Sequence, residues 1–335
     1  MTQWRGMRPP HQPSGGKVPR INDGRDDDAI GIDDLKIRGW TDAMIRDYLG
    51  DEDFRTSVDH WANFSGRKVW YIERVVAAEV LPDFKERFIA SLNRRTLPES
   101  VIATTLDRLE KLTAYHQIID GIAKGDAIGG PTALAEIVAE SLIANNGLDT
   151  TDITSRYLEW WRGGSFDTGP TYALVFKLID DGVEPSVAVK AAHDSLGGNS
   201  AGCGPAHRNS VIAACSSIST DDVPDAARAE ALITHHDPIA GDAAAVVALL
   251  CRCLLEGMTW EAAKEFVGRH PGTSAAFAEI IARPLDPGGF ALDAVRAAIG
   301  FMDGEDALER AIEFAGEDNY CPVIVGALLG ATQGK

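Results

Sequence analysis

The sequence lacks several features that mark broad classes of protein. It has no apolar run near 20 residues, so we expect no transmembrane helix. Residues 1–16 contain no apolar core segment, so we expect that they are not a secretory signal peptide. Positive charge is scarce, because 32 Lys and Arg stand against 50 Asp and Glu and give a formal net charge of −18. Binding of phosphate backbones needs a basic surface, so we expect no nucleic-acid binding.

Cysteine is also sparse. The five cysteines, at positions 203, 215, 251, 253 and 321, are odd in number and show no regular spacing. The pair at 251 and 253 lies in an apolar run and lacks the spacing of a zinc site. Reduced thiols in a hydrophobic core are the simplest interpretation, and they fit a cytoplasmic protein.

Length and composition predict a large domain with a smaller module. Residues 1–30 are rich in Pro, Gly, Arg and Asp, which predicts a disordered tail. Residues 31–95 resemble a small helix-turn-helix-like accessory module, with a short helix between Thr41 as N-cap and Gly50 as its end. Residues 69–78 contain the only strand that we expect. The charges of this module nearly balance (11 Lys/Arg against 12 Asp/Glu), which favours docking over DNA binding.

Residues 96–335 show helical periodicity nearly throughout. In the segment 132–145, Leu134, Val138 and Leu142 fall on one face. The segment 171–180 continues this pattern, and the segment 242–255 is apolar on most sides, which predicts a central buried helix. Thr259 is expected to cap the helix that follows. We therefore predict an all-α domain.

Two short loops in this domain place an aspartate among glycines. Asp126 lies in the loop 125–131, where flanking glycines allow a ligand to approach the backbone; a helix-ending turn is the alternative. Asp167 lies in the loop 166–170, where it can contact a ligand or, like Thr168, cap the next helix.

A third loop, residues 196–208, is unusually long and rich in small residues. Such residues free backbone N–H groups to bind an anion, and Arg208 adds a fixed positive charge. Cys203 beside His207 offers a weaker alternative, a thiol nucleophile. The predicted ligand-binding residues of this loop are Gly198, Asn199, Ser200, Gly202, Gly204 and Arg208.

Two further motifs complete the set. His235 precedes the buried helix, where it can face a ligand unless the segment only caps the helix through Asp237 or Asp242. Glu317 and Asp318 precede an apolar segment with Pro322 in its first turn and with Gly326 and Gly330 four residues apart. Carboxylates at the start of a tightly packed helix can hold a metal ion or a sugar hydroxyl.

Together these loops resemble the ADP-ribosylglycohydrolase family, relatives of the enzyme that reactivates dinitrogenase reductase. The matches run in family order over residues 115–335: 125–127, 160–169, the glycine loop ending at Arg208, 234–235 and 316–331. The resemblance implies an all-α fold, removal of ADP-ribose from modified side chains or related acceptors, and usually two magnesium ions.

The chain also departs from the family pattern. The family's Thr-Asp-Asp-Thr corresponds here to residues 129–132, which contain no carboxylate. The family's final Asp-Thr-Asp-Thr corresponds to Glu317, Asp318, Asn319 and Tyr320. The resemblance therefore implies at most one Mg²⁺, held by Glu317 and Asp318, in place of the two-magnesium centre.

These motifs lead to two hypotheses. In the first, the protein is a hydrolase that cleaves an N- or O-glycosidic bond of ADP-ribose or a related conjugate, with Asp126, Glu317 and Asp318 around the distal ribose. One carboxylate, Asp126, would stabilise the oxocarbenium-like state and another, Glu317, would activate water. In the alternative, the protein has lost hydrolysis and binds an ADP-ribose-like ligand or serves as a docking protein. The expected partner is an ADP-ribose-like small molecule or an ADP-ribosylated protein.

Overall fold

The computed structural model describes residues 29–56, 67–316 and 318–332. The chain forms two compact units, Met1–Thr113 and Ala114–Lys335, which divide inside helix α5 (Glu99–Gly125). From the sequence we expected this division before that helix, between residues 95 and 96. Of the predicted tail, residues 29 and 30 belong to a strand, and residues 1–28 lie outside the described residues.

The first unit combines short helices with a small antiparallel sheet of order β1-β3-β2, in which Ile30 pairs with Trp70 and Phe54 pairs with Val69. The prediction of a single strand was wrong, because β1 and β2 have three residues each and are too short to show a periodicity. The elements are β1 (Ala29–Gly31), α1 (Ile32–Ile37), α2 (Asp42–Met44), the π-helical turn η2 (Ile45–Leu49), β2 (Phe54–Thr56), β3 (Arg67–Tyr71), α3 (Ile72–Glu79), α4 (Pro82–Leu92) and the start of α5.

The predicted caps of the first unit are confirmed. The Thr41 hydroxyl accepts a hydrogen bond from the Met44 amide (3.1 Å) at the start of α2. Gly50 ends the helical segment with a φ of 62°, which favours glycine.

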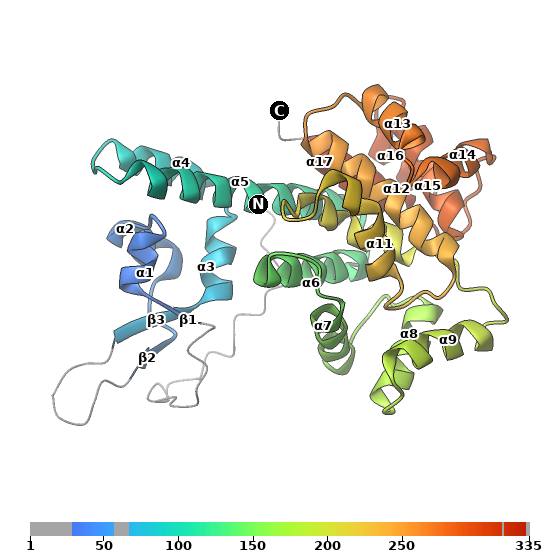
Figure 1. Ribbon diagram of the computed structural model, residues 1–335, viewed down its shortest axis with the longest axis horizontal. Coiled ribbons are helices and arrows are strands. Elements are labelled where there is room, and N and C mark those ends of the chain that lie inside the picture. The colour runs from blue at the N-terminus through green and yellow to red at the C-terminus, as the bar shows by residue number, and fades with distance from the viewer. Residues whose placement is uncertain (1–28, 57–66, 317, 333–335) are drawn as a thin grey trace. The chain divides into compact units, whose positions relative to one another are not determined.

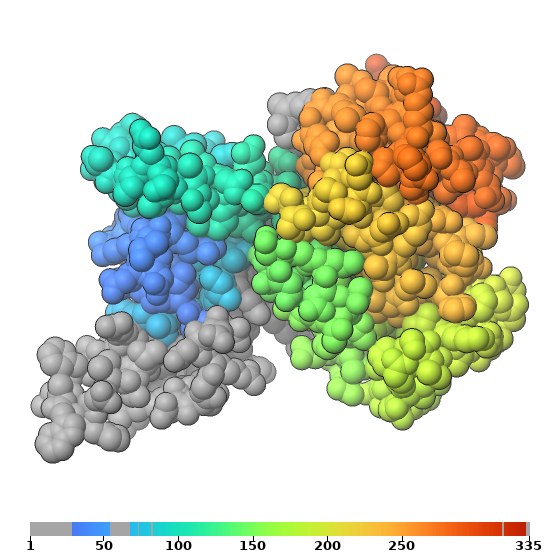
Figure 2. Space-filling view, viewed as in Figure 1, coloured from blue at the N-terminus to red at the C-terminus, as the bar shows by residue number. Residues whose placement is uncertain are grey.

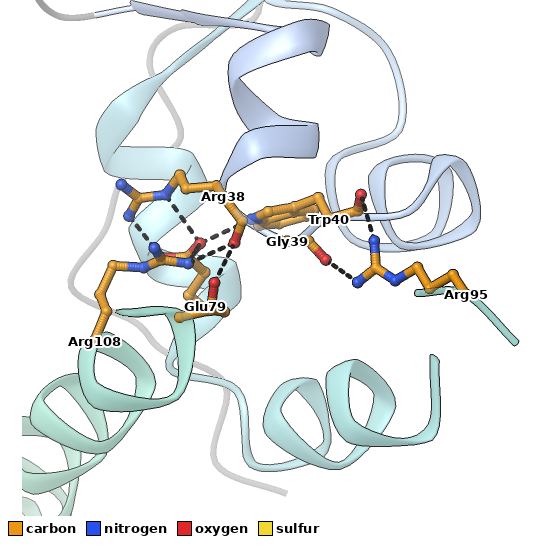
Figure 3. A network of polar contacts seen from close by, with 7 residues as sticks. Arg38, Gly39, Trp40, Glu79, Arg95 and Arg108 are labelled. Carbon is orange, nitrogen blue, oxygen red and sulfur yellow. Dashed lines mark hydrogen bonds and ion pairs between the residues drawn. The ribbon is translucent and has the colours of Figure 1, made fainter. Parts of the chain in front are cut away.

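A buried carboxylate joins three segments of this unit (Figure 3). The Glu79 side chain, which is fully buried, accepts hydrogen bonds from Arg38 (3.0 and 2.7 Å) and Arg108 (3.2 and 3.0 Å). The Trp40 indole donates a further bond to it (2.8 Å). Arg95 donates to the Trp40 carbonyl oxygen (3.4 Å). The first part of α5 thus belongs to the core of the first unit, which explains why the unit extends beyond residue 95.

The second unit is entirely helical over its described residues, apart from one isolated bridge between Gly202 and Phe290, and the all-α prediction is confirmed. Its elements, after the end of α5, are α6 (Gly130–Asn145), α7 (Thr150–Arg162), α8 (Pro170–Asp180), α9 (Pro185–Ser195), α10 (Gly204–Arg208), η3 (Asn209–Ala214), η4 (Thr220–Asp222), α11 (Val223–Ala231), α12 (Pro238–Leu255), α13 (Trp260–Arg269), α14 (Ser274–Ala282), α15 (Ala291–Met302), α16 (Ala307–Phe314) and α17 (Cys321–Thr332).

Helix α12 lies at the centre of the second unit, where it packs against α10, α11, η3, α13, α14, α15 and α17 (Figure 1). By length and composition alone α12 could cross a membrane, but 78% of it is buried inside the protein, as in the core helix that the sequence predicted. The surfaces of α6 to α9, green to lime in Figure 2, lie side by side on the viewed face. All five cysteines are free and buried, as expected.

Small residues allow α17 to contact the second half of α5 backbone to backbone. A Cβ atom on Gly326 would lie 2.1 Å from the Gly121 carbonyl oxygen, and one on Gly330 would lie 2.2 Å from that of Gln117. Neither carbonyl can move without disturbing its helix. The tight packing inferred from the four-residue interval between these glycines is therefore confirmed.

Replacement of Gly326 by alanine is expected to lower the free energy of unfolding by about 1–3 kcal/mol or more, because the new methyl group forces the two helices apart. Urea denaturation followed by circular dichroism measures this loss. Gly169→Ala is the control, since a Cβ there meets nothing within 4 Å and its φ is −61°. Equal stability of the two variants would contradict the close contact.

Candidate functional site

Asp126 fixes the loop between α5 and α6. Its Oδ1 accepts hydrogen bonds from the amides of Ile128 (3.2 Å) and Gly129 (2.7 Å). Its Oδ2 accepts from the amide (2.9 Å) and the hydroxyl (2.6 Å) of Thr132. These four bonds satisfy donors of the turn between α5 and α6. The alternative that the sequence left open, a helix-ending turn, therefore describes what Asp126 does in this structure. Asp126 therefore has a structural function whether or not it also meets a ligand.

Asp167 is held differently. The Tyr320 hydroxyl donates a 2.6 Å hydrogen bond to Asp167 Oδ1, whereas Oδ2 is buried without a hydrogen-bond partner. A Cβ on Gly130 would lie 2.8 Å from that Oδ2, so the carboxylate lies against the first turn of α6. The positive end of the helix dipole favours a carboxylate there. Asp167 does not cap α8, whose N-cap residue is Gly169 without a side-chain bond.

Tyr320 brings these residues together with a buried histidine. Its ring packs on the His207 ring with the centroids 4.8 Å apart and the planes 34° apart. Burial, the hydrogen bond to Asp167 and the charges of Asp167 and Asp126 all raise the pKa of Tyr320, so its hydroxyl remains a proton donor. We call Asp126, Gly130, Asp167, His207 and Tyr320 the Asp167 cluster.

His207 is neutral in the folded protein. It is 7% exposed, its Nδ1 has no hydrogen-bond partner, and burial together with the Arg208 charge lowers its pKa from 6.5 to about 3. A neutral imidazole beside Tyr320 adds no positive charge to the cluster. The negative charge of Asp167 is therefore not offset by this neighbour.

The buried histidine predicts a loss of stability in acid. The unfolded chain binds a proton on residue 207 near pH 6.5, whereas the folded chain does so only near pH 3. The free energy of unfolding should therefore be at its full value above about pH 6.5 and fall as the pH decreases towards 3. Urea titrations over this range measure the slope, which His207→Gln should reduce. His236→Gln, at an exposed histidine, is the control, and an unchanged slope in His207→Gln would contradict the assignment.

The first part of the glycine loop closes helix α9. Gly197 and Gly198 have φ values of 67° and 82°, and their amides donate to the carbonyl oxygens of Asp194 (3.0 Å) and His193 (3.0 Å). The Asn199 amide donates to a carbonyl of the preceding turn (3.2 Å). These amides satisfy the end of the helix. The predicted anion nest at Gly198 and Asn199 is therefore corrected, since its donors are already used.

The second part of the loop lies against His235. Ser200, 1% exposed, shares a 2.6 Å hydrogen bond with His193 Nδ1. Cβ atoms on Gly202 and Gly204 would lie 3.5 and 3.1 Å from the His235 ring, so the loop backbone approaches this ring closely. Burial, then Arg208 and His207, lower the pKa of His235 well below its usual value. At the next turn the capping alternative holds for Asp237, which accepts from the Ile239 amide (3.0 Å).

Arg208 belongs to the core. Its side chain is 1% exposed and donates to Glu230 (2.8 Å) and to the Thr234 hydroxyl (2.8 Å). Glu230 also accepts bonds from the hydroxyl of Tyr157 (2.7 Å) and the amide group of Asn209 (3.1 Å). The prediction that Arg208 binds a ligand anion is corrected, because its guanidinium is buried and paired.

Cys203 and Asp318 lie at the other edge of the cluster. The Cys203 thiol donates to the Asp318 carbonyl oxygen (3.8 Å), and burial raises the pKa of this thiol to about 11. A protonated, buried thiol does not fit the alternative of a cysteine nucleophile. The Asp318 side chain is exposed. Glu317, predicted as a catalytic and metal-binding residue, lies outside the described residues, and that prediction stays a prediction.

The described residues of this cluster do not fit a two-magnesium centre. Asn319 uses its side chain within the protein, donating to the carbonyl oxygens of Asp286 (3.2 Å) and Gly288 (2.9 Å) and accepting from the Cys321 amide (2.9 Å). Both carboxylate oxygens of Asp126 already accept two hydrogen bonds each, and Asp167 Oδ1 accepts one from the Tyr320 hydroxyl. Within residues 29–56, 67–316 and 318–332 no group of three or more His, Cys, Asp or Glu could hold a metal ion. We derive no chemical step through a metal.

The structure thus places the charges of Asp126 and Asp167 near the Tyr320 hydroxyl, and the sequence predicted a role for neither Tyr320 nor His207 in this site. Tyr320 is 153 positions from Asp167, and only its place among the acidic residues before α17 pointed to it. His207 was visible only as a neighbour of Cys203. The cluster offers one buried carboxylate oxygen without a partner, and the exposed Asp318 lies two residues before its member Tyr320.

Comparisons with known proteins agree on the fold. The ADP-ribosylglycohydrolase family model matches residues 103–335. A solved structure described as an ADP-ribosylglycohydrolase-related protein complex has a TM-score of 0.50 and 24% sequence identity, over 67% of this chain and 87% of that chain. At this identity the likeness shows the fold alone. None of the curated proteins matches this chain.

Proposed function

This chain belongs to the ADP-ribosylglycohydrolase family, and from that premise we propose that it hydrolyses an N- or O-glycosidic bond of ADP-ribose or a related nucleotide conjugate. One observation carries the proposal. Asp167 Oδ2 is buried, has no hydrogen-bond partner and belongs to a carboxylate whose other oxygen Tyr320 holds in place. A buried acceptor that lacks a donor is costly, and a ribose hydroxyl would supply the missing bond.

The reaction needs negative charge beside the anomeric carbon. Its transition state resembles an oxocarbenium ion, which a nearby carboxylate stabilises. We assign this role to Asp167 in place of Asp126, because all four hydrogen bonds of Asp126 hold the start of α6. The exposed Asp318, with Glu317 beside it in the sequence, would accept the proton of the attacking water. The water oxygen would bond to the anomeric carbon as the glycosidic bond breaks, and the leaving nitrogen or oxygen would take up a proton from solvent while Asp318 releases to solvent the proton that it accepted.

The diphosphate would lie against Gly202 and Gly204. Both residues are partly exposed, and their backbones lie close to the His235 ring, to which a Cβ atom would come within 3.5 Å at Gly202 and 3.1 Å at Gly204. Arg208 takes no direct part in this arrangement. It stabilises the segment through Thr234, whose hydroxyl also shares a 2.7 Å hydrogen bond with His235 Nδ1.

A second candidate function is binding of ADP-ribose, or of an ADP-ribosylated protein, without hydrolysis. The specific observation in its favour is that Asn319 and Tyr320, which stand where the family has an acidic motif, are committed to bonds within the protein. Such a protein would retain the ligand-binding residues and lose turnover.

Incubation of the full-length protein with an ADP-ribosylated protein, in the presence of Mg²⁺ or of EDTA, separates these functions. Release of ADP-ribose that falls in Glu317→Gln supports hydrolysis and extends the site to that residue. A melting temperature raised by ADP-ribose without any release supports binding alone. If ADP-ribose is not released and does not raise the melting temperature either, both functions are overturned.

A further inference from the structure

We infer that the Tyr320 hydroxyl takes the place of a divalent cation beside Asp167, and that this carboxylate binds its ligand without a metal ion. The inference rests on the proposed function for the ligand, but the part that concerns the cation stands on the protein alone.

Protein contacts alone orient Asp167. Tyr320 donates to Oδ1 at 2.6 Å, a short bond of the kind that charged acceptors make. The backbone at Asp167 has a φ of 53°, which few residues other than glycine, asparagine and aspartate adopt. The Asp167 side chain also packs against Gly130, where an added Cβ atom would lie 2.6 Å from the Cβ of Asp167. No metal ligand bond is needed to fix this side chain.

Tyr320 is itself fixed. Its ring stacks on His207, which is 7% exposed, and its residue lies directly before α17. The residue on its N-terminal side, Asn319, is 4% exposed and makes three hydrogen bonds within the protein. Rotation of the Tyr320 side chain away from Asp167 would therefore lose both this hydrogen bond and the ring contact with His207.

The remaining donors do not suffice for a cation at this point. Mg²⁺ requires near-octahedral coordination by oxygen atoms. Within the described part of the Asp167 cluster, Asp126 already accepts four hydrogen bonds, and Asp167 Oδ1 accepts one. Among the carboxylate oxygens of this cluster Asp167 Oδ2 alone lacks a partner, and the other unpartnered atom, His207 Nδ1, is a nitrogen rather than an oxygen ligand. A single oxygen beside a tyrosine hydroxyl is a hydrogen-bond acceptor for a ligand, not a cation cage.

The exchange of a cation for a hydroxyl changes the charge of the site. A divalent ion would cancel the negative charge of Asp167, whereas a neutral hydroxyl orients the carboxylate and leaves its charge in place. The site then attracts groups that donate hydrogen bonds, such as the vicinal hydroxyls of a ribose, and a positive charge that develops on the sugar. Binding should depend on the Tyr320 hydroxyl and be indifferent to magnesium.

Calorimetric titration of the full-length protein tests this inference. After removal of metals with EDTA, titration with MgCl₂ or MnCl₂ should show no saturable binding that Asp167→Asn abolishes. The Kd for ADP-ribose should agree in EDTA and in millimolar Mg²⁺. Tyr320→Phe, which keeps the ring on His207 and removes only the hydroxyl, should weaken ADP-ribose binding about tenfold or more.

Tyr48→Phe is the matched control, because it removes a similar tyrosine–aspartate bond (Tyr48 to Asp83, 2.7 Å) in the first unit. It should leave ADP-ribose binding unchanged. Saturable Mg²⁺ binding that Asp167→Asn removes, or a Kd for ADP-ribose that Mg²⁺ tightens tenfold or more, would overturn the inference. Mg²⁺ binding that survives Asp167→Asn lies at another site and leaves the inference standing. If ADP-ribose does not bind under any condition, the proposed function fails, and the metal titration still decides the question of the cation.

Discussion

Asp167→Asn is expected to lower turnover of an ADP-ribosylated substrate by about 10²–10³-fold, the range found when a group that stabilises transition-state charge is removed. The asparagine keeps the size of the side chain, and its carbonyl oxygen can still accept the Tyr320 hydrogen bond. What it loses is the negative charge that would stabilise the oxocarbenium-like state. A single-turnover assay of ADP-ribose release measures the effect on chemistry apart from product release.

The control for this experiment is Asp126→Asn. It makes the same chemical change at the neighbouring aspartate, whose oxygens accept four hydrogen bonds at the start of α6. We expect Asp126→Asn to lower the melting temperature and Asp167→Asn to leave it nearly unchanged. Full turnover in Asp167→Asn would show that the chemistry lies elsewhere, whatever the result for Asp126.

Glu230→Ala is expected to lower the free energy of unfolding by about 3–5 kcal/mol, because it leaves the buried guanidinium of Arg208 without its counter-charge. The Arg208 and Glu230 side chains are 1% and 0% exposed, and their atoms lie 2.8 Å apart. The same substitution also removes the acceptor for the hydroxyl of Tyr157. Stability of most domains is only about 5–15 kcal/mol, so this loss would be a large share of it.

Urea denaturation followed by tryptophan fluorescence measures the loss in Glu230→Ala. Asp225→Ala is the control, because its ion pair with Arg228 (3.1 Å) involves an aspartate side chain that is 85% exposed and contributes little. A second variant, Arg208→Met with Glu230→Gln, removes both charges and should recover part of the stability. Equal stability of Glu230→Ala and Asp225→Ala would contradict the buried pair.

The sequence predicted the helices of the second unit well because their signals are local. The segments expected at 132–145, 171–180 and 242–255 correspond to α6, α8 and α12, which begin two, one and four residues earlier. Each of these helices has a proline in its first turn, a strong start signal that the predictions did not use. The small sheet was mostly missed, since two of its strands are three residues long.

The site was predictable only in part, because burial and pairing depend on distant residues. Asp126 and Asp167 stand among glycines, which pointed to both. Arg208 looked available in a loop of small residues, but its partner Glu230 comes 22 positions later and on another helix. The bond between Tyr320 and Asp167 spans 153 positions, and no local pattern announces it.

We expect Asp167 Oδ2 to accept a hydroxyl of an ADP-ribose-like ligand. A crystal structure of the full-length protein soaked with ADP-ribose in EDTA tests it most directly. We expect a ribose hydroxyl within hydrogen-bond distance of Asp167 Oδ2, with the Tyr320 bond to Oδ1 intact and the diphosphate beside Gly202 and Gly204. ADP-ribose bound away from Asp167, or in contact with it only through a metal ion, would contradict the claim.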